Sequence, residues 1–417
     1  MSRRSRIATA ILVASLGGAI AGPVGAQDET LVRVGITLPL SGSGLASSGP
    51  IRDAVELLLG TTQIPGVRLE PVVLDHAVNG VHDPARGAAD MEALVADPAV
   101  LAVVGPFNSS VAERQIPISN AAGLLQCSPA NTDPSLTQGD AGRALRAAAP
   151  DRINYVRVQA TDDLQGPAMA RYATGTLGLR DVAVVDDGEG YGSGIADTFA
   201  AELAALGGTV TGRWTAPVGS ADLETIASEV AATGPDAVYF GGVTATGAPA
   251  LRLALVAAGL GEKPFLVAEG VADGSADTPD SYLALTGPDA AGTWTSQSAM
   301  HDYPGRADLD ALLRDAGLGG VAAYSGSAAA CAEVVIAAIA EAAARGSLDR
   351  ETVRAAATAG NGVVLSVLGP IRFDAVGDTL LRVVSFYRPD LAIDADPATP
   401  GVGDWIFIEQ VDLSEEG

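Results

Sequence analysis

The chain has 417 residues, of which 48% are hydrophobic and 18% are charged, so it is long and apolar enough to bury the cores of two or three domains. Its formal net charge is −25, and Lys263 is its single lysine. A surface this acidic repels nucleic acid and anionic lipid, which excludes both as partners.

The first 26 residues have the three parts of a secretory signal peptide. Three arginines among the first six residues precede an apolar run over residues 7–21, and the small residues Val24-Gly25-Ala26 follow. The run contains glycines and is shorter than the ~20 residues that a membrane span needs. We therefore expect cleavage after Ala26 and export of the mature chain to the periplasm. No second apolar run of spanning length is evident.

The next part of the chain alternates between short apolar strands and amphipathic helices. Strands are predicted over residues 31–38, 69–74, 100–104 and 124–127, with helices over 51–59, from 84 onward, and over 109–122. Asp83-Pro84 is a strong helix start, because aspartate caps the helix and proline suits its first turn. Buried strands separated by helices indicate a parallel sheet covered on both faces.

The same alternation begins again after residue 150. Strands are predicted over residues 153–158, 182–185, 210–214, 237–240 and 264–267, with helices between them. Two helices, 321–344 and 350–357, come next, followed by strands over 371–373, 380–387 and 405–411. The stretch 388–402, rich in Pro, Asp and Ala, is predicted to be an exposed loop. The chain is thus an α/β protein with two doubly wound parallel-sheet lobes.

The cysteines and histidines give few signals of chemistry. Cys127 and Cys331 have the option of pairing in an oxidising compartment, but a chain of this length does not depend on a disulfide. Both lie in apolar segments, which favours two buried thiols that pack as small hydrophobes. His76 and His82 stand six positions apart in a polar stretch without a third ligand, which favours a surface loop over a metal site.

Catalytic and cofactor motifs are missing. No serine lies in the G-x-S-x-G frame of a hydrolase nucleophile. The dinucleotide motif G-x-G-x-x-G is interrupted, because Ser47 stands in the place of its third glycine. We therefore expect neither an enzyme nor a bound cofactor or metal.

Polar loops that follow predicted strands indicate a binding site instead. Ser109 opens a helix directly after the strand 100–104, and the loop 128–132 follows the next strand. A serine hydroxyl, free N–H groups and the positive end of a helix suit a carboxylate. Taken alone, the segment around Ser109 favours a plain helix cap over a binding site. The two loops are expected to flank one crevice at the edge of the sheet.

The sequence resembles the substrate-binding proteins of branched-chain amino-acid (Leu/Ile/Val-type) ABC transporters, which have the type I periplasmic binding fold. The resemblance covers residues 32–411 and depends on the order of many short markers rather than on any one of them. These markers are Leu40-Ser41-Gly42, Asp83-Pro84, Val104-Gly105 with Ser109 and Ser110, Ser128-Pro129-Ala130-Asn131-Thr132, Asp162 with Gln165-Gly166-Pro167, Tyr191-Gly192, Gly241-Gly242, Glu269-Gly270, and Phe373-Asp374 with Gly377-Asp378.

The resemblance implies a set of ligand-binding residues. The ligand carboxylate is expected at Ser109 and at the loop that carries Ala130 and Thr132, and the ammonium at the same loop and at Glu269. Tyr191 is expected to close over the ligand from the second lobe. The two lobes would be joined by a hinge of three crossings.

Several residues depart from the family pattern. Ser48 and Val243 replace aromatic residues at the pocket edge, Phe107-Asn108 replaces an apolar residue and a disulfide-bonded cysteine, and the loop 75–83 is longer than usual. Phe107, Asn108 and Val243 would line the ligand's side chain, so we expect a roomier and more polar pocket than a leucine site. The alternative is that Asn108 caps its own helix and Phe107 lines an ordinary aliphatic site.

The expected organisation is a first lobe over residues 30–160 plus 300–375 and a second over 161–299 plus 376–417. The chain would act as a monomer that captures an amino acid or related zwitterion and delivers it to the permease of an ABC transporter. The alternative is a ligand sensor of the same fold, in which an aliphatic amide or urea controls a regulator or receptor.

Overall fold

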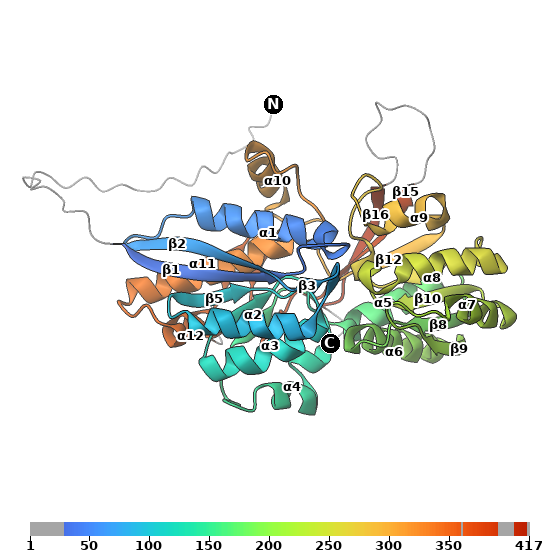
Figure 1. Ribbon diagram of the computed structural model, residues 1–417, viewed down its shortest axis with the longest axis horizontal. Helices are drawn as coiled ribbons and strands as arrows, with labels where there is room; N and C mark the ends of the chain where they lie inside the picture. The colour runs from blue at the N-terminus through green and yellow to red at the C-terminus, as the bar shows by residue number, and fades with distance from the viewer. Residues whose placement is uncertain (1–28, 360–361, 391–403, 415–417) are drawn as a thin grey trace, which may run out of the picture.

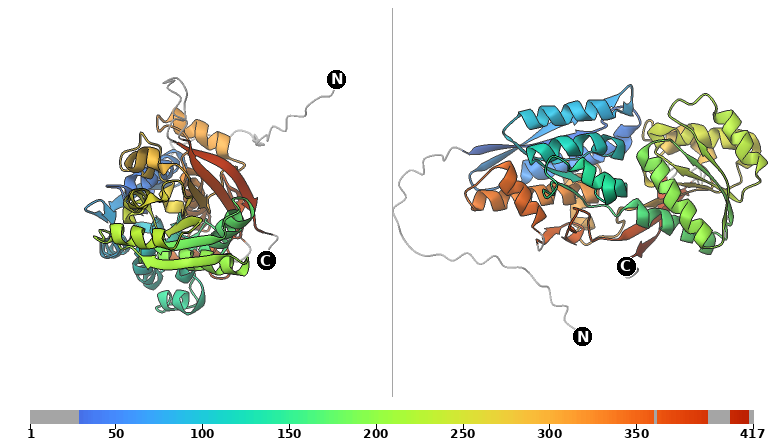
Figure 2. Two further views of the ribbon diagram at one scale, coloured as in Figure 1. Left: turned by 90° about the vertical axis from the view of Figure 1, so that its right-hand side faces the viewer. Right: turned by 90° about the horizontal axis from the view of Figure 1, so that it is seen from below.

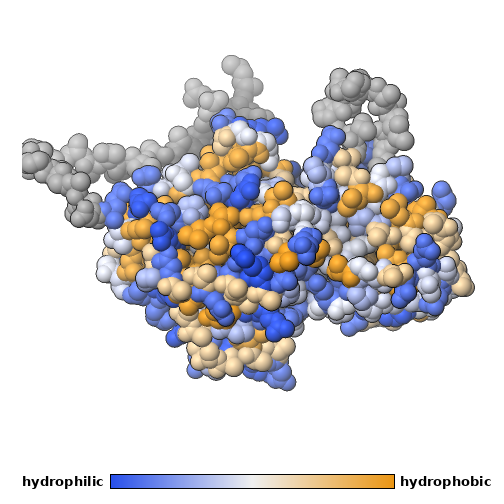
Figure 3. All heavy atoms as spheres, viewed as in Figure 1, coloured by the Kyte–Doolittle hydropathy of each residue, from blue (hydrophilic) through white to orange (hydrophobic). Residues whose placement is uncertain are grey.

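The chain forms two α/β lobes side by side (Figure 1) in a computed structural model that describes residues 29–359, 362–390 and 404–414. The expected signal segment and most of the predicted loop 388–402 lie outside the described residues. Residues 388–390 belong to a strand, so the prediction of a loop is wrong for these three. On the face shown in Figure 3, hydrophilic and hydrophobic side chains are interspersed over both lobes.

The first lobe contains a five-stranded sheet in the order β2-β1-β5-β6-β7, in which every pair is parallel. All five residues of β5 are buried, as expected for a central strand with helices on both faces. The strands are β1 (Thr30–Leu38), β2 (Val67–Asp75), β5 (Val100–Val104), β6 (Leu125–Ser128) and β7 (Tyr155–Arg157), with a small hairpin of β3 (Ala77–Val78) and β4 (Val81–His82).

Helices cover both faces of this sheet. The side chains of α1, α11 and α12 share one hydrophobic core with β1, and those of α2 pack in a separate core on the other face. Asp83 caps α2 by accepting a hydrogen bond from the Arg86 N–H, as predicted. The helices are α1 (Gly44–Thr61), α2 (Pro84–Ala96), α3 (Ser109–Ala122), α4 (Gly139–Leu145), α10 (Arg306–Asp315), α11 (Ser325–Ala344) and α12 (Arg350–Thr358), beside a hairpin of β13 (Val364–Ser366) and β14 (Gly369–Ile371).

The second lobe contains a seven-stranded sheet in the order β16-β15-β12-β11-β10-β8-β9. Its central strands are parallel, and the C-terminal strands β15 and β16 join one edge in antiparallel pairing. The elements are β8 (Asp181–Asp186), β9 (Thr209–Thr215), β10 (Ala237–Gly241), β11 (Phe265–Val267), β12 (Thr293–Gln297), β15 (Val383–Asp390), β16 (Asp404–Asp412), α5 (Asp162–Gly175), α6 (Gly190–Ala205), α7 (Leu223–Ala232), α8 (Ala248–Leu255) and α9 (Tyr282–Thr286).

The chain passes between the two sheets three times: from β7 to α5, from β12 to α10, and from β14 to β15. The lobes therefore share no strand, and three short segments connect them (Figure 2). This arrangement is the three-crossing hinge that the resemblance implies.

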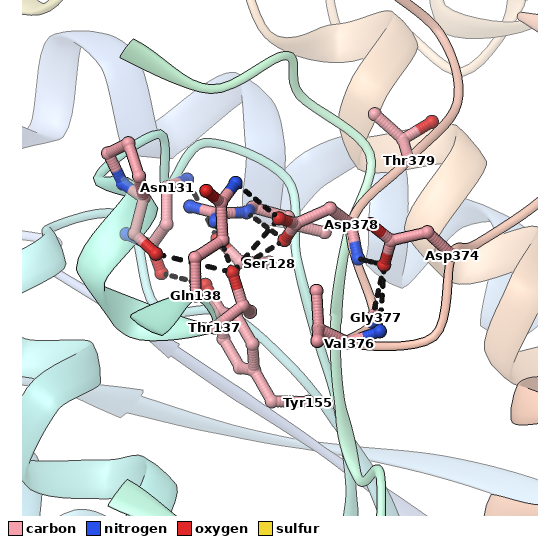
Figure 4. A network of polar contacts seen from close by, with 12 residues as sticks. Ser128, Asn131, Thr137, Gln138, Tyr155, Asp374, Val376, Gly377, Asp378 and Thr379 are labelled. Atoms are coloured by element: carbon pink, nitrogen blue, oxygen red, sulfur yellow. Dashed lines mark hydrogen bonds and ion pairs between the residues drawn. The ribbon is translucent and has the colours of Figure 1, made fainter. Parts of the chain in front are cut away.

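A buried ion pair fastens one of these crossings to the first lobe (Figure 4). The fully buried Arg157 at the end of β7 donates to Asp378 at 2.7 Å. Thr137 also donates to Asp378, at 2.8 Å. Burial alone would raise the pKa of Asp378, but the Arg157 guanidinium and these donors lower it below its usual range. The third crossing is thus fixed to β7 by a satisfied charge pair.

The structure corrects the prediction of two free thiols. Cys127 in β6 and Cys331 in α11 form a disulfide with a Cα–Cα distance of 5.6 Å. The bond joins a central strand to the helix that covers it. The apolar setting of both residues was read correctly, but their adjacency depends on α11 packing over β6, which a separation of 204 residues conceals in the sequence.

Helix α11 also corrects the prediction that no second apolar run of spanning length exists. Its 20 residues are long and apolar enough to cross a membrane by length and composition. Within the described residues, however, it lies mostly buried against α1, β5 and α12. It is therefore packed as a core helix of the first lobe.

Candidate ligand-binding site

The carboxyl ends of strands from both sheets surround one cavity between the lobes. Loops after β5 and β6 line it from the first lobe, and loops after β8, β10 and β11 line it from the second, as expected for parallel sheets. It holds about 370 Å³ of space not filled by atoms, open solvent included. All eight residues singled out from the sequence line it: Phe107, Asn108, Ser109, Ala130, Thr132, Tyr191, Val243 and Glu269.

The first lobe presents hydrogen-bond donors to this cavity. Ser109 is buried and is the first residue of α3, where N–H groups have no partner within the helix. The Thr132 hydroxyl is buried and makes no well-formed hydrogen bond within the described residues, although it lies near Asp162. The loops that carry these two residues are linked, because the Asn131 amide donates to the Phe107 carbonyl at 2.7 Å. This side of the cavity is suited to an anion.

The second lobe presents a buried acid on the opposite side. Glu269 follows β11 and is 3% exposed. One of its oxygens accepts from the Ser298 N–H at 3.0 Å and from the Ser298 hydroxyl at 2.6 Å. Burial raises the pKa of Glu269 to about 7, although these two donors oppose the shift. Among the ion pairs of the described residues, none includes Glu269, so the cavity holds a buried acid without a cation.

Two tyrosine hydroxyls face the cavity without partners. Tyr191 lies in the first turn of α6, and Tyr324 lies just before α11. Both line the cavity, and neither hydroxyl has a hydrogen-bond partner in the described residues. Unmet hydrogen-bonding groups of this kind are uncommon in a folded protein unless a ligand or water completes them.

Asn108 lines the cavity and does not cap its helix. It occupies the cap position of α3, but its side chain makes no capping hydrogen bond. Within the described part of the chain its buried Oδ1 accepts no well-formed hydrogen bond, although the side chain interacts with His76 and opposes the lowering of that histidine's pKa by burial. Phe107 packs edge-on against Tyr324, with ring centroids 5.1 Å apart. The structure therefore lacks the capping contact on which the aliphatic alternative depended. Ser48 is fully buried, and Ser47 lies at the edge of the site in its place.

The prediction of a surface loop for the two histidines is wrong. His76 is fully buried and hydrogen-bonds Thr37, and burial lowers its pKa to about 3. His82 is 7% exposed and lines the cavity. Both side chains pack inward because the chain from β2 to α2 folds into the β3–β4 hairpin, whose strands of two residues are too short for a sequence pattern to reveal.

His82 takes part in a polar contact between the lobes. Its Nε2 lies 3.0 Å from both carboxylate oxygens of Glu189, the residue before α6. The Ser110 hydroxyl donates to the same carboxylate at 3.0 Å. Glu189 therefore connects the second lobe to two residues of the first at the margin of the cavity. No local sequence pattern reveals this contact, because the partners are 107 positions apart.

The charge of the cavity is mainly negative. Asp187, Glu189 and Glu269 line it, and His82 is the single basic side chain among its described lining residues. Burial raises the pKa of Asp187 to about 6. Among the described residues, no group of three His, Cys, Asp or Glu is placed to hold a metal ion.

Comparisons with known proteins show the family of the chain. The family model described as periplasmic binding protein matches residues 31–390. The Leu/Ile/Val-binding protein BraC3 of Rhizobium johnstonii is 32% identical over 56% of this chain and 59% of its own length, so this alignment spans little more than half of that relative. The Leu/Ile/Val-binding protein homolog 2 of Brucella abortus is 28% identical over 84% of this chain and 88% of its own length.

Solved structures share the fold at low sequence identity. The leucine-binding protein LivK of Thermotoga maritima superposes with a TM-score of 0.74 at 22% identity, covering 92% of this chain and 99% of its own. A solute-binding protein of an ABC transporter from R. palustris, solved with 4-hydroxybenzoate, has a TM-score of 0.73 at 18% identity and covers 92% of this chain and 97% of its own.

The fold and the cavity between its lobes define a substrate-binding protein with the type I periplasmic binding fold, and not an enzyme. The chain belongs to the periplasmic binding protein family, which confirms its resemblance to the branched-chain amino-acid type of ABC-transporter substrate-binding protein.

Proposed function

We propose that the protein binds an amino acid, or a closely related small zwitterion, between its lobes and delivers it to the permease of an ABC transporter. The ligand carboxylate lies at Ser109, Ala130 and Thr132, and the ammonium lies at Glu269, with Tyr191 closing over it. Phe107, Asn108 and Val243 line the side chain. The ligand is larger or more polar than leucine, because Asn108 offers the side chain an unmet hydrogen-bonding group.

One observation carries this proposal: a buried carboxyl without a cation faces a buried anion site on the other lobe. Glu269 and the start of α3 belong to different sheets yet line one cavity. A zwitterion supplies a charge of opposite sign to each of them. A molecule that touches both also holds the lobes together, so its binding favours the closed form.

The proposal extends to the location and partners of the chain. Residues 1–26 act as a cleaved signal peptide, and the mature protein works as a monomer in the periplasm. Its lobes comprise residues 30–160 with 300–375 and residues 161–299 with 376–417. Intact mass of the exported protein tests the cleavage, because retention of Met1 to Ala26 in a membrane fraction contradicts export to the periplasm.

A thermal-shift screen tests the ligand class. The panel contains the standard amino acids, aliphatic amides, urea and aromatic carboxylates such as 4-hydroxybenzoate. We expect polar or long amino acids to raise the melting temperature most. Binding of leucine, isoleucine or valine at least tenfold more tightly than every polar candidate contradicts the polar pocket. Binding of amides or urea alone contradicts the zwitterion site and favours the sensor alternative.

A further inference from the structure

A second, larger hollow lies beside the ligand cavity. This outer chamber has about 1610 Å³ of space not filled by atoms, open solvent included. It is lined by residues of both lobes, among them Leu45 and Ser47 of α1, Asp273 of the second lobe, and Tyr303 and Arg306 near the second crossing. None of the eight predicted site residues lines it.

A smaller hollow, here called the neck, lies between the outer chamber and the ligand cavity. It shares His82, Phe107, Asn108, Val243 and Gly270 with the ligand cavity and shares Ser47 and Asp273 with the outer chamber. Small residues, including Ser43, Gly44 and Ala245, form part of its remaining wall. Because Phe107, Asn108 and Val243 are the residues expected to line the ligand's side chain, the neck adjoins that part of the ligand cavity.

Aromatic side chains form much of the wall of the outer chamber. Five aromatic side chains line it: His301, Tyr303, Tyr324, Tyr387 and Trp405. The hydroxyls of Tyr303 and Tyr324 are buried and have no hydrogen-bond partner among the residues that the structure describes, and these two residues are 9% and 1% exposed. Tyr324 lines both the ligand cavity and the outer chamber. The aromatic side chains favour a ligand group that contains a ring. The tyrosine hydroxyls without partners favour a hydrogen-bond acceptor attached to that ring.

The neck contains a further polar group that a ligand could satisfy. Asn108 lines both the ligand cavity and the neck, and its buried Oδ1 accepts no well-formed hydrogen bond from the described residues, although its side chain also interacts with buried His76. An N–H group at this level of the ligand's side chain would satisfy it. A short aliphatic side chain such as that of leucine satisfies neither Asn108 nor the tyrosines.

We propose that the protein takes α-amino acids with an extended side chain, which carries an amide in the neck and ends in a ring in the outer chamber. The inference rests on the proposed function, because the amino-acid head must lie between Ser109 and Glu269. It adds the chemical class of the side chain, which the amino-acid site alone leaves open.

A matched pair of ligands tests the side chain. L-glutamine and Nδ-benzyl-L-glutamine differ only in the benzyl group that would reach the outer chamber. Calorimetry should show at least tenfold tighter binding of the benzyl derivative. Ala323 is exposed and lines the outer chamber, so Ala323→Trp fills this space from the surface. This variant should remove the tenfold gain while the affinity for glutamine changes less than twofold.

Two further variants keep the result unambiguous. Ala201→Trp adds the same bulk at an exposed position of α6 that lines none of the three hollows, and it should keep the full gain. Ala322→Trp is a second way to fill the outer chamber if Ala323→Trp lowers the melting temperature of the free protein.

The outcomes separate this inference from the proposed function. A benzyl derivative that binds no more tightly than glutamine overturns the inference, as does a gain that survives both chamber-filling variants. If leucine or another short amino acid binds while the derivative does not, the inference fails and the amino-acid site stands. If the folded protein binds no amino acid at all, the proposed function fails as well.

Discussion

The surroundings of two buried carboxylates shift their pKa values in opposite directions. Asp378 faces the Arg157 guanidinium, which holds its pKa below the usual range. Within the described residues, Glu269 accepts hydrogen bonds only from the N–H and hydroxyl of Ser298, and burial raises its pKa to about 7. The charge of Asp378 is therefore already balanced by a residue of the protein. Glu269 retains the desolvation cost that a bound ammonium would offset.

Substitutions at the two charged ends of the site should weaken binding by separable amounts. Ser109→Ala removes one hydrogen bond to a charged group and should cost about 1.5–3 kcal/mol. Glu269→Ala leaves a buried ammonium unpaired and should cost about 2–5 kcal/mol. Calorimetry with the ligand found in the screen measures both. Glu341→Ala, an exposed change on α11, is the control. If neither site variant weakens binding tenfold, these residues do not hold the ligand.

The free protein should lose stability as the pH rises from about 5 to 7.5. Burial raises the pKa of Glu269 and Asp273 to about 7, that of Asp187 to about 6, and that of Asp162 well above its usual range. A raised pKa means that the folded state binds more protons than the unfolded state across this window, so unfolding becomes easier with rising pH. Buried His76, whose pKa is lowered to about 3, acts in the opposite direction, but the four acids outnumber it. Each such group contributes at most about 1.4 kcal/mol per pH unit.

Melting temperatures measured at several pH values check this trend. Glu269→Gln should flatten the slope, because the amide does not titrate. A melting temperature that rises steadily from pH 5 to 7.5 would contradict the proposed burial of these acids in the free protein.

At the scale of elements, the strands, the helices and the type of sheet were predictable, because hydrophobic periodicity and the order of elements determine them. The buried strands and their alternation with helices reveal two parallel sheets, and the rule that sites lie at the carboxyl ends of parallel strands predicts that Ser109 and the loop 128–132 flank one crevice. Glu269 was assigned to the site only through the family resemblance. Helix α3 was predicted with the bounds that the structure gives. The β3–β4 hairpin was missed because two-residue strands leave no pattern, and His82 was misassigned with it.

The disulfide between β6 and α11 should contribute strongly to the stability of the first lobe. It closes a loop across 204 positions, for which the chain-entropy model gives about 5 kcal/mol. A Cys127→Ala/Cys331→Ala double variant should therefore melt at a lower temperature than the parent in the absence of reductant. Adding reductant should lower the melting temperature of the parent and leave the double variant unchanged. Equal melting temperatures in all four conditions would contradict the bond.

Breaking the ion pair at the third crossing should destabilise the fold. Asp378→Ala leaves the fully buried Arg157 without its charge partner and should cost about 3–5 kcal/mol in the free energy of unfolding. The exposed pair of Glu341 and Arg345 provides a control, because Glu341→Ala should change stability by less than about 1 kcal/mol. Denaturant unfolding measures the free energy of unfolding of both variants. If Asp378→Ala and Glu341→Ala lower it equally, the buried pair contributes no more to stability than the exposed pair.

At the scale of the whole molecule, the two lobes were predictable and the contacts between them were not. Each lobe has its own sheet and core, so local patterns reveal it. The His82–Glu189 contact joins residues that no local pattern relates, and the neck exists because small residues from three distant segments meet. The position of the site could therefore be predicted, while the extent of the space around it could not.

Ligand binding should compact the molecule. The lobes are joined by three segments, and a zwitterion that contacts both favours the form in which they are closed. Small-angle scattering should give a smaller radius of gyration with saturating ligand than without it. In the Glu269→Ala variant, the radius of gyration should decrease less than in the parent when both proteins have the same fraction of ligand bound at the first lobe. An unchanged radius despite tight binding would indicate a preformed pocket.

The division of the site between two sheets has a consequence for inhibition. Ser109 and Thr132 hold one end of the proposed ligand from the first lobe, and Glu269 holds the other end from the second. A small carboxylate that lacks an ammonium would occupy the first lobe without bridging to the second. Such a molecule would compete for the site yet leave the protein open, and would therefore act as an antagonist of uptake rather than as a transported solute.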